Sequence, residues 1–175
     1  MKKFDDFLNN ENKAAKDKNG FDAKARVAKF LSLIDELYDK IDHEWLSPYI
    51  DDGTITTGLC DKTITEEKLG SYVVKEKFLE IGGKRVMLSP VGTILIGTDA
   101  RIDIEYLTKS FMIVHIGENI NGFSDMLQVK VNDHIEKKAT KPGKPTWKLV
   151  NVASRIYYKK ITAEVFQNIL MDLLK

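Results

Sequence analysis

Four charged residues at alternate positions are the clearest candidates for chemistry in this chain. Asp99, Arg101, Asp103 and Glu105 are separated by single apolar residues. Alternate residues of a β-strand share one face, so a strand here would gather three carboxylates and one guanidinium. Paired carboxylates can bind a divalent cation or act as acid and base in hydrolysis. The row is also typical of a solvated strand face with an internal ion pair, which the sequence favours because no other segment completes a metal shell.

A lysine-rich segment is the second candidate. Lys137, Lys138, Lys141 and Lys144 precede Trp147, and cations beside aromatic rings can hold single-stranded nucleic acid through phosphate contacts and stacking. The 27 Lys and Arg residues nevertheless balance 26 Asp and Glu residues over the whole chain, for a net charge of +1. Such a chain has no overall field to attract nucleic acid. We therefore interpret the segment as a solvated loop and keep nucleic-acid binding as an alternative.

The other candidate residues fit structural roles better. Asp39 and His43 lie one helical turn apart and could ligate a metal, but this is also the wet side of an amphipathic helix. His115 stands in an apolar run and is expected to be a hydrogen-bonded core residue. Cys60 has no flanking signature of a thiol enzyme and is expected to be buried and inert. No glycine pattern of a phosphate-binding loop occurs, and no GxSxG, so we expect no cofactor.

Two amphipathic helices should position these residues. Asp22 is a plausible N-cap for a helix whose apolar residues recur at spacings of three and four, and which should run to about Trp45 or Leu46. Ser47 and Pro48 should stop it, because the residue before a proline disfavours α geometry. Thr162 should cap a final helix with a continuous apolar stripe. Both stripes need a surface to cover.

The segment between the helices reads as a series of strands. The glycine pair Gly82-Gly83 predicts a two-residue hairpin turn, since both positions of a type I′ turn need positive φ. Pro90 cannot donate to a ladder, so its strand should end, bulge or lie at an edge there. Strands are expected over residues 54–59, 72–81, 84–89, 93–96, 101–106, 111–116, 127–131, 147–152 and 155–158, some of them merging. The pattern predicts an α+β fold, an antiparallel β-meander of about six to eight strands covered by an N-terminal and a C-terminal helix.

Length and composition indicate a single domain. The chain has 175 residues with 43% hydrophobic content, enough for one substantial core. We expect residues 1–20 to be weakly ordered and residues 21–175 to form one α+β domain. One cysteine, no apolar run of membrane-spanning length and no signal-peptide pattern predict a cytoplasmic protein without a membrane partner.

Elimination then directs the functional hypothesis. Without a nucleophile signature, a metal-spaced cluster or a phosphate-binding loop, the sequence favours a non-enzymatic, cytosolic protein-binding module, of which accessory and immunity-type proteins are examples. Its partner is a protein whose identity the sequence does not reveal, and homo-oligomerisation stays open. The alternatives are a metal-dependent hydrolase using Asp99, Asp103 and Glu105, and a nucleic-acid binder using the lysine-rich segment.

Overall fold

The predicted α+β meander is confirmed by the computed structural model, which describes residues 22–67, 69–93, 98–122, 125, 143–152 and 156–175. Its helical elements are α2 (Ala23–Lys40), the π-helix η1 (Ile41–Trp45), α3 (Ser47–Asp51) and α5 (Ala163–Leu174). Its strands are β1 (Ile55–Glu66), β2 (Gly70–Ile81), β3 (Lys84–Gly92), β4 (Ala100–Tyr106), β5 (Lys109–Gly117), β6 (Pro145–Val152) and β7 (Ile156–Lys160). No helix in these ranges is long and apolar enough to cross a membrane.

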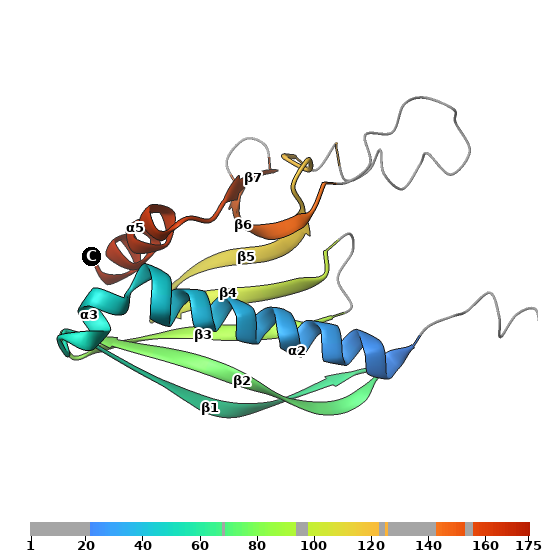
Figure 1. Ribbon diagram of the computed structural model, residues 1–175, viewed down its shortest axis with the longest axis horizontal. Helices are drawn as coiled ribbons and strands as arrows, with labels where there is room; N and C mark the ends of the chain where they lie inside the picture. The colour runs from blue at the N-terminus through green and yellow to red at the C-terminus, as the bar shows by residue number, and fades with distance from the viewer. Residues whose placement is uncertain (1–21, 68, 94–97, 123–124, 126–142, 153–155) are drawn as a thin grey trace, which may run out of the picture.

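The seven strands form one antiparallel sheet in chain order, from β1 at one edge to β7 at the other. Helix α2 runs across one face, and α5 packs on the same side near the C-terminal end of α2 (Figure 1). Both helices bury their apolar stripes against the alternate residues of the strands that point toward them. The centre of this core contains Phe30, Ile34, Leu37 and Ile41 from the first helix and η1, Leu79, Val86, Leu88, Ile102, Ile104 and Ile113 from the sheet, and Phe166, Ile169 and Leu173 from α5.

Local signals in the sequence set the ends of both long helices. The Asp22 carboxylate accepts a hydrogen bond of 3.0 Å from the Ala25 N–H, and the Thr162 hydroxyl accepts one of 3.3 Å from the Val165 N–H. Both predicted caps are thus confirmed. The first helix was expected to stay α-helical to about Trp45. It changes instead to η1, where the Leu46 N–H donates to the Ile41 carbonyl at 2.9 Å.

The hairpin of β1 and β2 is longer and more twisted than the sequence suggested. Its register is continuous from Ile55↔Ile81 to Glu66↔Gly70. The residues that point to the core switch from odd-numbered to even-numbered positions along β2. Leu79 is buried near one end of the hairpin, and Val74 is buried toward the other. An unbroken ladder can do this only by twisting, as two-stranded ribbons do strongly. Gly58 does not interrupt β1, because the Phe78 ring occupies the space beside it and would lie 2.3 Å from an added Cβ.

A fork opens in the sheet where β2 leaves β3. The last pair between them is Lys77↔Leu88. In the same register, the next hydrogen-bonded pair would join Lys75 to Pro90, which has no N–H to give to the Lys75 carbonyl. The Tyr38 hydroxyl lies 3.1 Å from the carbonyl oxygens of both Lys75 and Leu88, and donates there instead. Beyond Pro90 the register of β3 against β4 shifts, which confirms the predicted irregularity.

The Gly82-Gly83 turn is also confirmed, with φ of 57° and 77° at its two residues. The expected strand over 127–131 and residues 94–96 of the expected strand over 93–96 lie outside the described residues, as do residues 1–20 and most of the lysine-rich segment.

The core gives a first testable prediction. Phe166→Ala should lower the free energy of unfolding by about 3 to 5 kcal/mol, because its ring is fully buried and lies 5.4 Å from the Trp45 ring. Chemical denaturation measures the change. Asn168→Ala, at an exposed position of the same helix, is the matched control and should leave stability within about 0.5 kcal/mol. Equal effects of the two substitutions would contradict the placement of α5.

Candidate functional site

The acidic row divides between the two faces of the sheet. Arg101 donates from its Nε and one terminal nitrogen to the two oxygens of Asp103, at 2.8 and 2.7 Å. Asp99 precedes β4 and turns to the helix-covered side, where its carboxylate lies 2.8 Å from the Lys29 Nζ and 3.3 Å from the His115 Nδ1. The expectation of one shared face is therefore wrong for Asp99. Only Asp103 and Glu105 remain together, with Arg101 paired to the former.

This division weakens a metal site at the row. The hydrogen bonds from Arg101 to Asp103 raise the pKa of the guanidinium, and its fixed positive charge already compensates the carboxylate. Across the described residues, no group of three or more His, Cys, Asp or Glu side chains is placed to hold a metal ion.

His115 is buried on the helix-covered face, as a core residue should be. Its ring lies 5.3 Å from the Trp147 ring at a steep angle. Burial lowers the pKa of His115 below its usual value, although the hydrogen bond to Asp99 opposes that shift. The imidazole is therefore neutral near pH 7. With Lys29 on the other side of Asp99, the group ties α2 to the sheet.

The lysine candidates are placed only in part. Lys137, Lys138 and Lys141 lie outside the described residues, whereas Lys144 is exposed. Trp147 is only 7% exposed and its ring contacts His115. A ring in that position is not available to stack on a nucleic-acid base.

The expectation that Cys60 is buried is wrong. The residue lies on β1 at the edge of the sheet and is exposed, with its Sγ 3.7 Å from the Glu76 carbonyl oxygen. The position of β1 in the sheet decides this exposure, and no residue near Cys60 in the sequence signals it.

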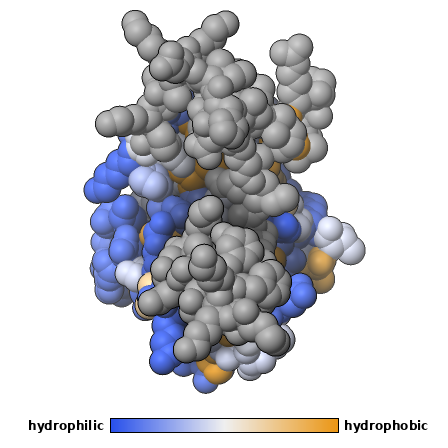
Figure 2. Space-filling view, turned by 90° about the vertical axis from the view of Figure 1, so that its right-hand side faces the viewer, coloured by the Kyte–Doolittle hydropathy of each residue, from blue (hydrophilic) through white to orange (hydrophobic). Residues whose placement is uncertain are grey.

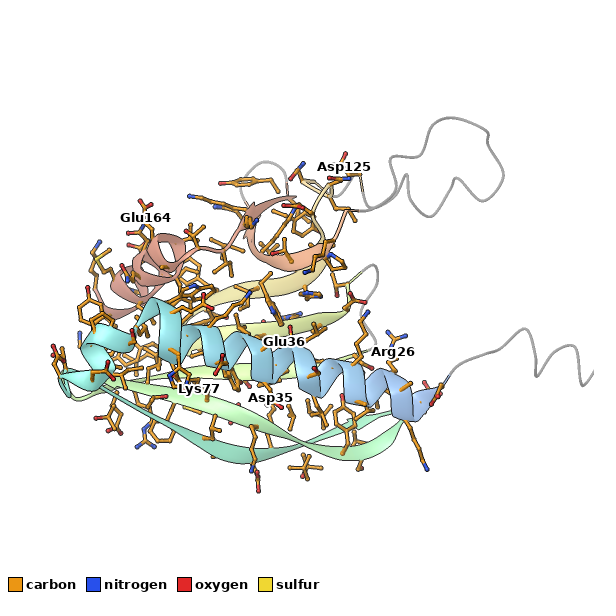
Figure 3. The ribbon with its side chains drawn as sticks, viewed as in Figure 1. Arg26, Asp35, Glu36, Lys77, Asp125 and Glu164 are labelled. Atoms are coloured by element: carbon orange, nitrogen blue, oxygen red, sulfur yellow. The ribbon has the colours of Figure 1, made fainter. Side chains whose placement is uncertain are left out.

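A buried ion pair joins η1 to the sheet where the sequence indicated only a polar helix face. Lys77 is 2% exposed, and its Nζ lies 2.7 Å from Asp42 and 5.4 Å from the centre of the Tyr38 ring. Figure 3 shows Lys77 next to the C-terminal part of α2, while the exposed residues Asp35 and Glu36 lie further back along the helix. Asp42 lies one helical turn after the buried Tyr38 and so faces the same strand. Lysine at an alternating strand position is usually exposed, so its burial had no local signal.

Glu66 anchors a second polar group at the far end of the β1–β2 hairpin. Its carboxylate accepts hydrogen bonds of 3.0 Å from the N–H and from the hydroxyl of Thr93, and one of 2.5 Å from the Tyr72 hydroxyl. Arg26 donates to the same threonine. These hydrogen bonds join α2, β1, β2 and the end of β3, and the polar groups of the cluster serve as one another's donors and acceptors. The arrangement is a structural tie.

An apolar pocket is the feature best suited to binding. It has a volume of about 450 Å³ and lies between α3, α5 and the first residues of β1. Met171 is 52% exposed and Tyr49 is 43% exposed. The other end of the molecule, at the N-terminus of α2, is mainly hydrophilic where described residues are visible (Figure 2). The lining comprises Leu46, Tyr49, Thr54, Ile55, Ile81, Gln167, Leu170, Met171, Leu174 and Lys175.

The two edge strands of the sheet, β1 and β7, differ in whether their outer backbone groups are paired. At the β7 edge, the Tyr158 N–H donates to the Asn121 carbonyl at 3.0 Å and Gly122 bridges Tyr157. At the β1 edge, no described segment pairs with the outer side of the strand. The open edge begins at Ile55, which also lines the pocket.

Comparison of the chain with protein-family models, with curated proteins and with solved structures finds no match.

Divalent cations test the acidic row directly. We expect Mg²⁺, Mn²⁺, Ca²⁺ and Zn²⁺ to leave the melting temperature unchanged, because Arg101 already neutralises Asp103 and Asp99 lies on the other face. Thermal unfolding during titration measures the shift, with Asp103→Asn as the control. A saturable rise that disappears in Asp103→Asn would make metal-dependent hydrolysis the better hypothesis.

The buried ion pair yields a stability prediction. Asp42→Ala should cost about 3 kcal/mol, because it leaves the ammonium of Lys77 buried without its partner. Asp39→Ala is the matched control, since Asp39 is exposed on the preceding turn, and should cost less than about 1 kcal/mol. Urea denaturation compares the two. Similar losses would show that Lys77 does not depend on Asp42.

Proposed function

We propose that this chain is a non-enzymatic protein-binding module that docks a partner protein at the apolar pocket between α3 and α5. Accessory and immunity-type proteins work in this way, by occupying a partner and not by transforming a substrate. The observation that carries the proposal is the pocket itself, with Met171 and Tyr49 exposed beside aliphatic side chains. Exposed apolar surface in a concave site costs free energy in water, which a partner's apolar side chain would recover.

The lining suits a protein ligand. Methionine is flexible and polarizable, so Met171 can adapt to side chains of different shape. Tyr49 brings an aromatic face and a hydroxyl, a combination enriched at protein interfaces. Gln167 donates from its side chain to the Trp45 carbonyl at 3.1 Å, which fixes its position on the wall of the pocket.

The competing functions gain less from the geometry. Hydrolysis at the acidic row would need Asp99 beside Asp103, and the two lie on different faces. Nucleic-acid binding would use Trp147, whose ring is buried in the core and cannot stack on a base. A cytoplasmic location also remains our proposal, and the single exposed thiol of Cys60 is compatible with a reducing compartment.

Selection from a random peptide library tests the docking proposal. The immobilised full chain should enrich peptides with a large apolar residue, and fluorescence anisotropy should give saturable binding of the purified peptides. Met171→Glu should weaken that binding by about tenfold or more, because it places a charge at the apolar pocket. Asn168→Glu introduces the same charge on the exposed face of α5 and is the matched control.

Two results would contradict the proposal. The first is that no peptide binds the full chain saturably. The second is that the selected peptides bind the wild type and Met171→Glu equally well, which would place the binding surface elsewhere.

A further inference from the structure

The turn between β2 and β3 determines which backbone N–H and C=O groups of β1 point toward β2 and which point away from it. Gly82 and Gly83 both have positive φ, as in a type I′ turn, and the residues flanking such a two-residue turn exchange both backbone hydrogen bonds. Ile81 therefore bonds toward β3 at its pair with Lys84. Residues one position away, beginning with Glu80, bond toward β1.

This alternation continues because the β1–β2 register is unbroken. The partners of Glu80, Phe78, Glu76 and Val74 in β1 use their backbone groups internally. The residues between those partners direct their N–H and C=O groups away from the sheet, where no described segment accepts them. They are Thr57, Leu59, Asp61 and Thr63.

We propose that an extended segment of a partner protein adds to the sheet along β1, antiparallel to it, and places an apolar side chain in the pocket at the start of that strand. This inference rests on the proposed protein-binding function and specifies how the partner is recognised. An outward row of alternating donors and acceptors is complementary to a β-strand backbone. Antiparallel pairing continues the arrangement of the other strands and is the more stable ladder.

The charges of β1 do not oppose such an addition. Charged side chains commonly protect edge strands from pairing. Here the Asp61 carboxylate is paired with Lys75, and the Lys62 ammonium contacts Ser89 and lies 3.5 Å from Glu76. Both charges at the centre of the edge are therefore compensated within the sheet. Leu59, between Gly58 and Cys60, is 52% exposed and offers an apolar contact to the added strand.

Acidic residues at the pocket end indicate the charge of the segment. Asp51 and Asp52 are both exposed where α3 turns into β1. Hydrogen bonds from the side chain and the backbone of Thr54 lower the pKa of Asp52, so its carboxylate stays ionised near neutral pH. An antiparallel segment reaches this point with its C-terminal end. A lysine or arginine directly after the apolar anchor would meet the two carboxylates.

A second copy of the chain is a weaker occupant. A ladder along the 12 residues of β1 spans roughly 40 Å. With a strand spacing of about 4.8 Å, this ladder covers on the order of 200 Å² of each partner, well below the ~800 Å² of a stable interface. Two rigid copies joined edge to edge also leave both pockets unfilled, whereas a free segment can follow the twist of β1 and enter the pocket.

The peptide TTKTVTVTLR is a probe designed for this geometry. In antiparallel register its leucine lies opposite Ile55 at the pocket, its arginine near Asp51 and Asp52, and its lysine opposite Asp61. The two valines then lie opposite Leu59 and Thr57, so their N–H groups point at β1. The threonine N–H groups flanking the first valine point to solvent.

N-methylation separates strand addition from simple docking in the pocket. Methylating both valine nitrogens should weaken binding to the full chain by about tenfold or more, since it removes two interstrand hydrogen bonds. Methylating the two threonine nitrogens flanking the first valine should change the Kd by less than about threefold. On the protein, Leu59→Pro should weaken binding because it removes an outward donor, and Leu59→Thr should retain that donor.

Three outcomes would overturn the inference. The probe peptide fails to bind; or the two methylation patterns have equal effects; or the chain self-associates in sedimentation experiments through an edge that Leu59→Pro disrupts, which would make a second copy the occupant. Library peptides that still depend on Met171 in any of these cases would leave the proposed docking at the pocket intact. The comparison of the two N-methylated peptides tests strand addition even if the Leu59→Pro variant does not fold.

Discussion

The hydroxyl of Tyr38 bridges β2 and β3 at the point where the two strands separate. Pro90 cannot supply the N–H that the Lys75 carbonyl would receive in a regular ladder, so β2 and β3 separate. Burial raises the pKa of the Tyr38 hydroxyl well above its usual value, despite a hydrogen bond from the Lys77 backbone. The group is thus a permanent donor at the fork. Since Tyr38 belongs to α2, the helix that covers the sheet also closes the gap in it.

The separation of β2 from β3 lets the β1–β2 ribbon twist independently of the rest of the sheet. Freed from β3, the β1–β2 ribbon twists far enough to bring Val74 and Tyr72 against the start of α2, and Glu66 and Thr93 then fasten its tip to the sheet. The ribbon is thus held at its tip by these polar contacts, and closer to its base by Tyr38 and by the buried ion pair of Lys77 and Asp42. No described segment pairs with its outer side, whereas Asn121 and Gly122 pair with the edge at β7. This asymmetry makes the β1 edge and its adjoining pocket the best candidate for recognition.

Features with a local cause could be predicted from the sequence, and those that depend on distant neighbours could not. Asp22, Thr162 and the Gly82-Gly83 turn act on residues within four positions, so their roles are visible in the sequence itself. The irregularity at Pro90 has the same character. The exposure of Cys60, the burial of Lys77 and the turn of Asp99 to the other face all depend on which element lies alongside. The pocket is less predictable still, because it is assembled from α3, α5 and two strands that are far apart in the chain.

The number of residues in the π-helix η1 sets the direction in which the chain leaves the first helix. Its wider turn adds one residue to the helix without adding a turn, which rotates everything after it by roughly 100° relative to a continuous α-helix. That rotation brings Trp45 onto Phe166. A relative of this chain lacking a single residue between Ile41 and Trp45 would have a regular helix there, with α3 turned away from α5. Loss of one residue in η1 would therefore separate two walls of the pocket and leave the sheet in place.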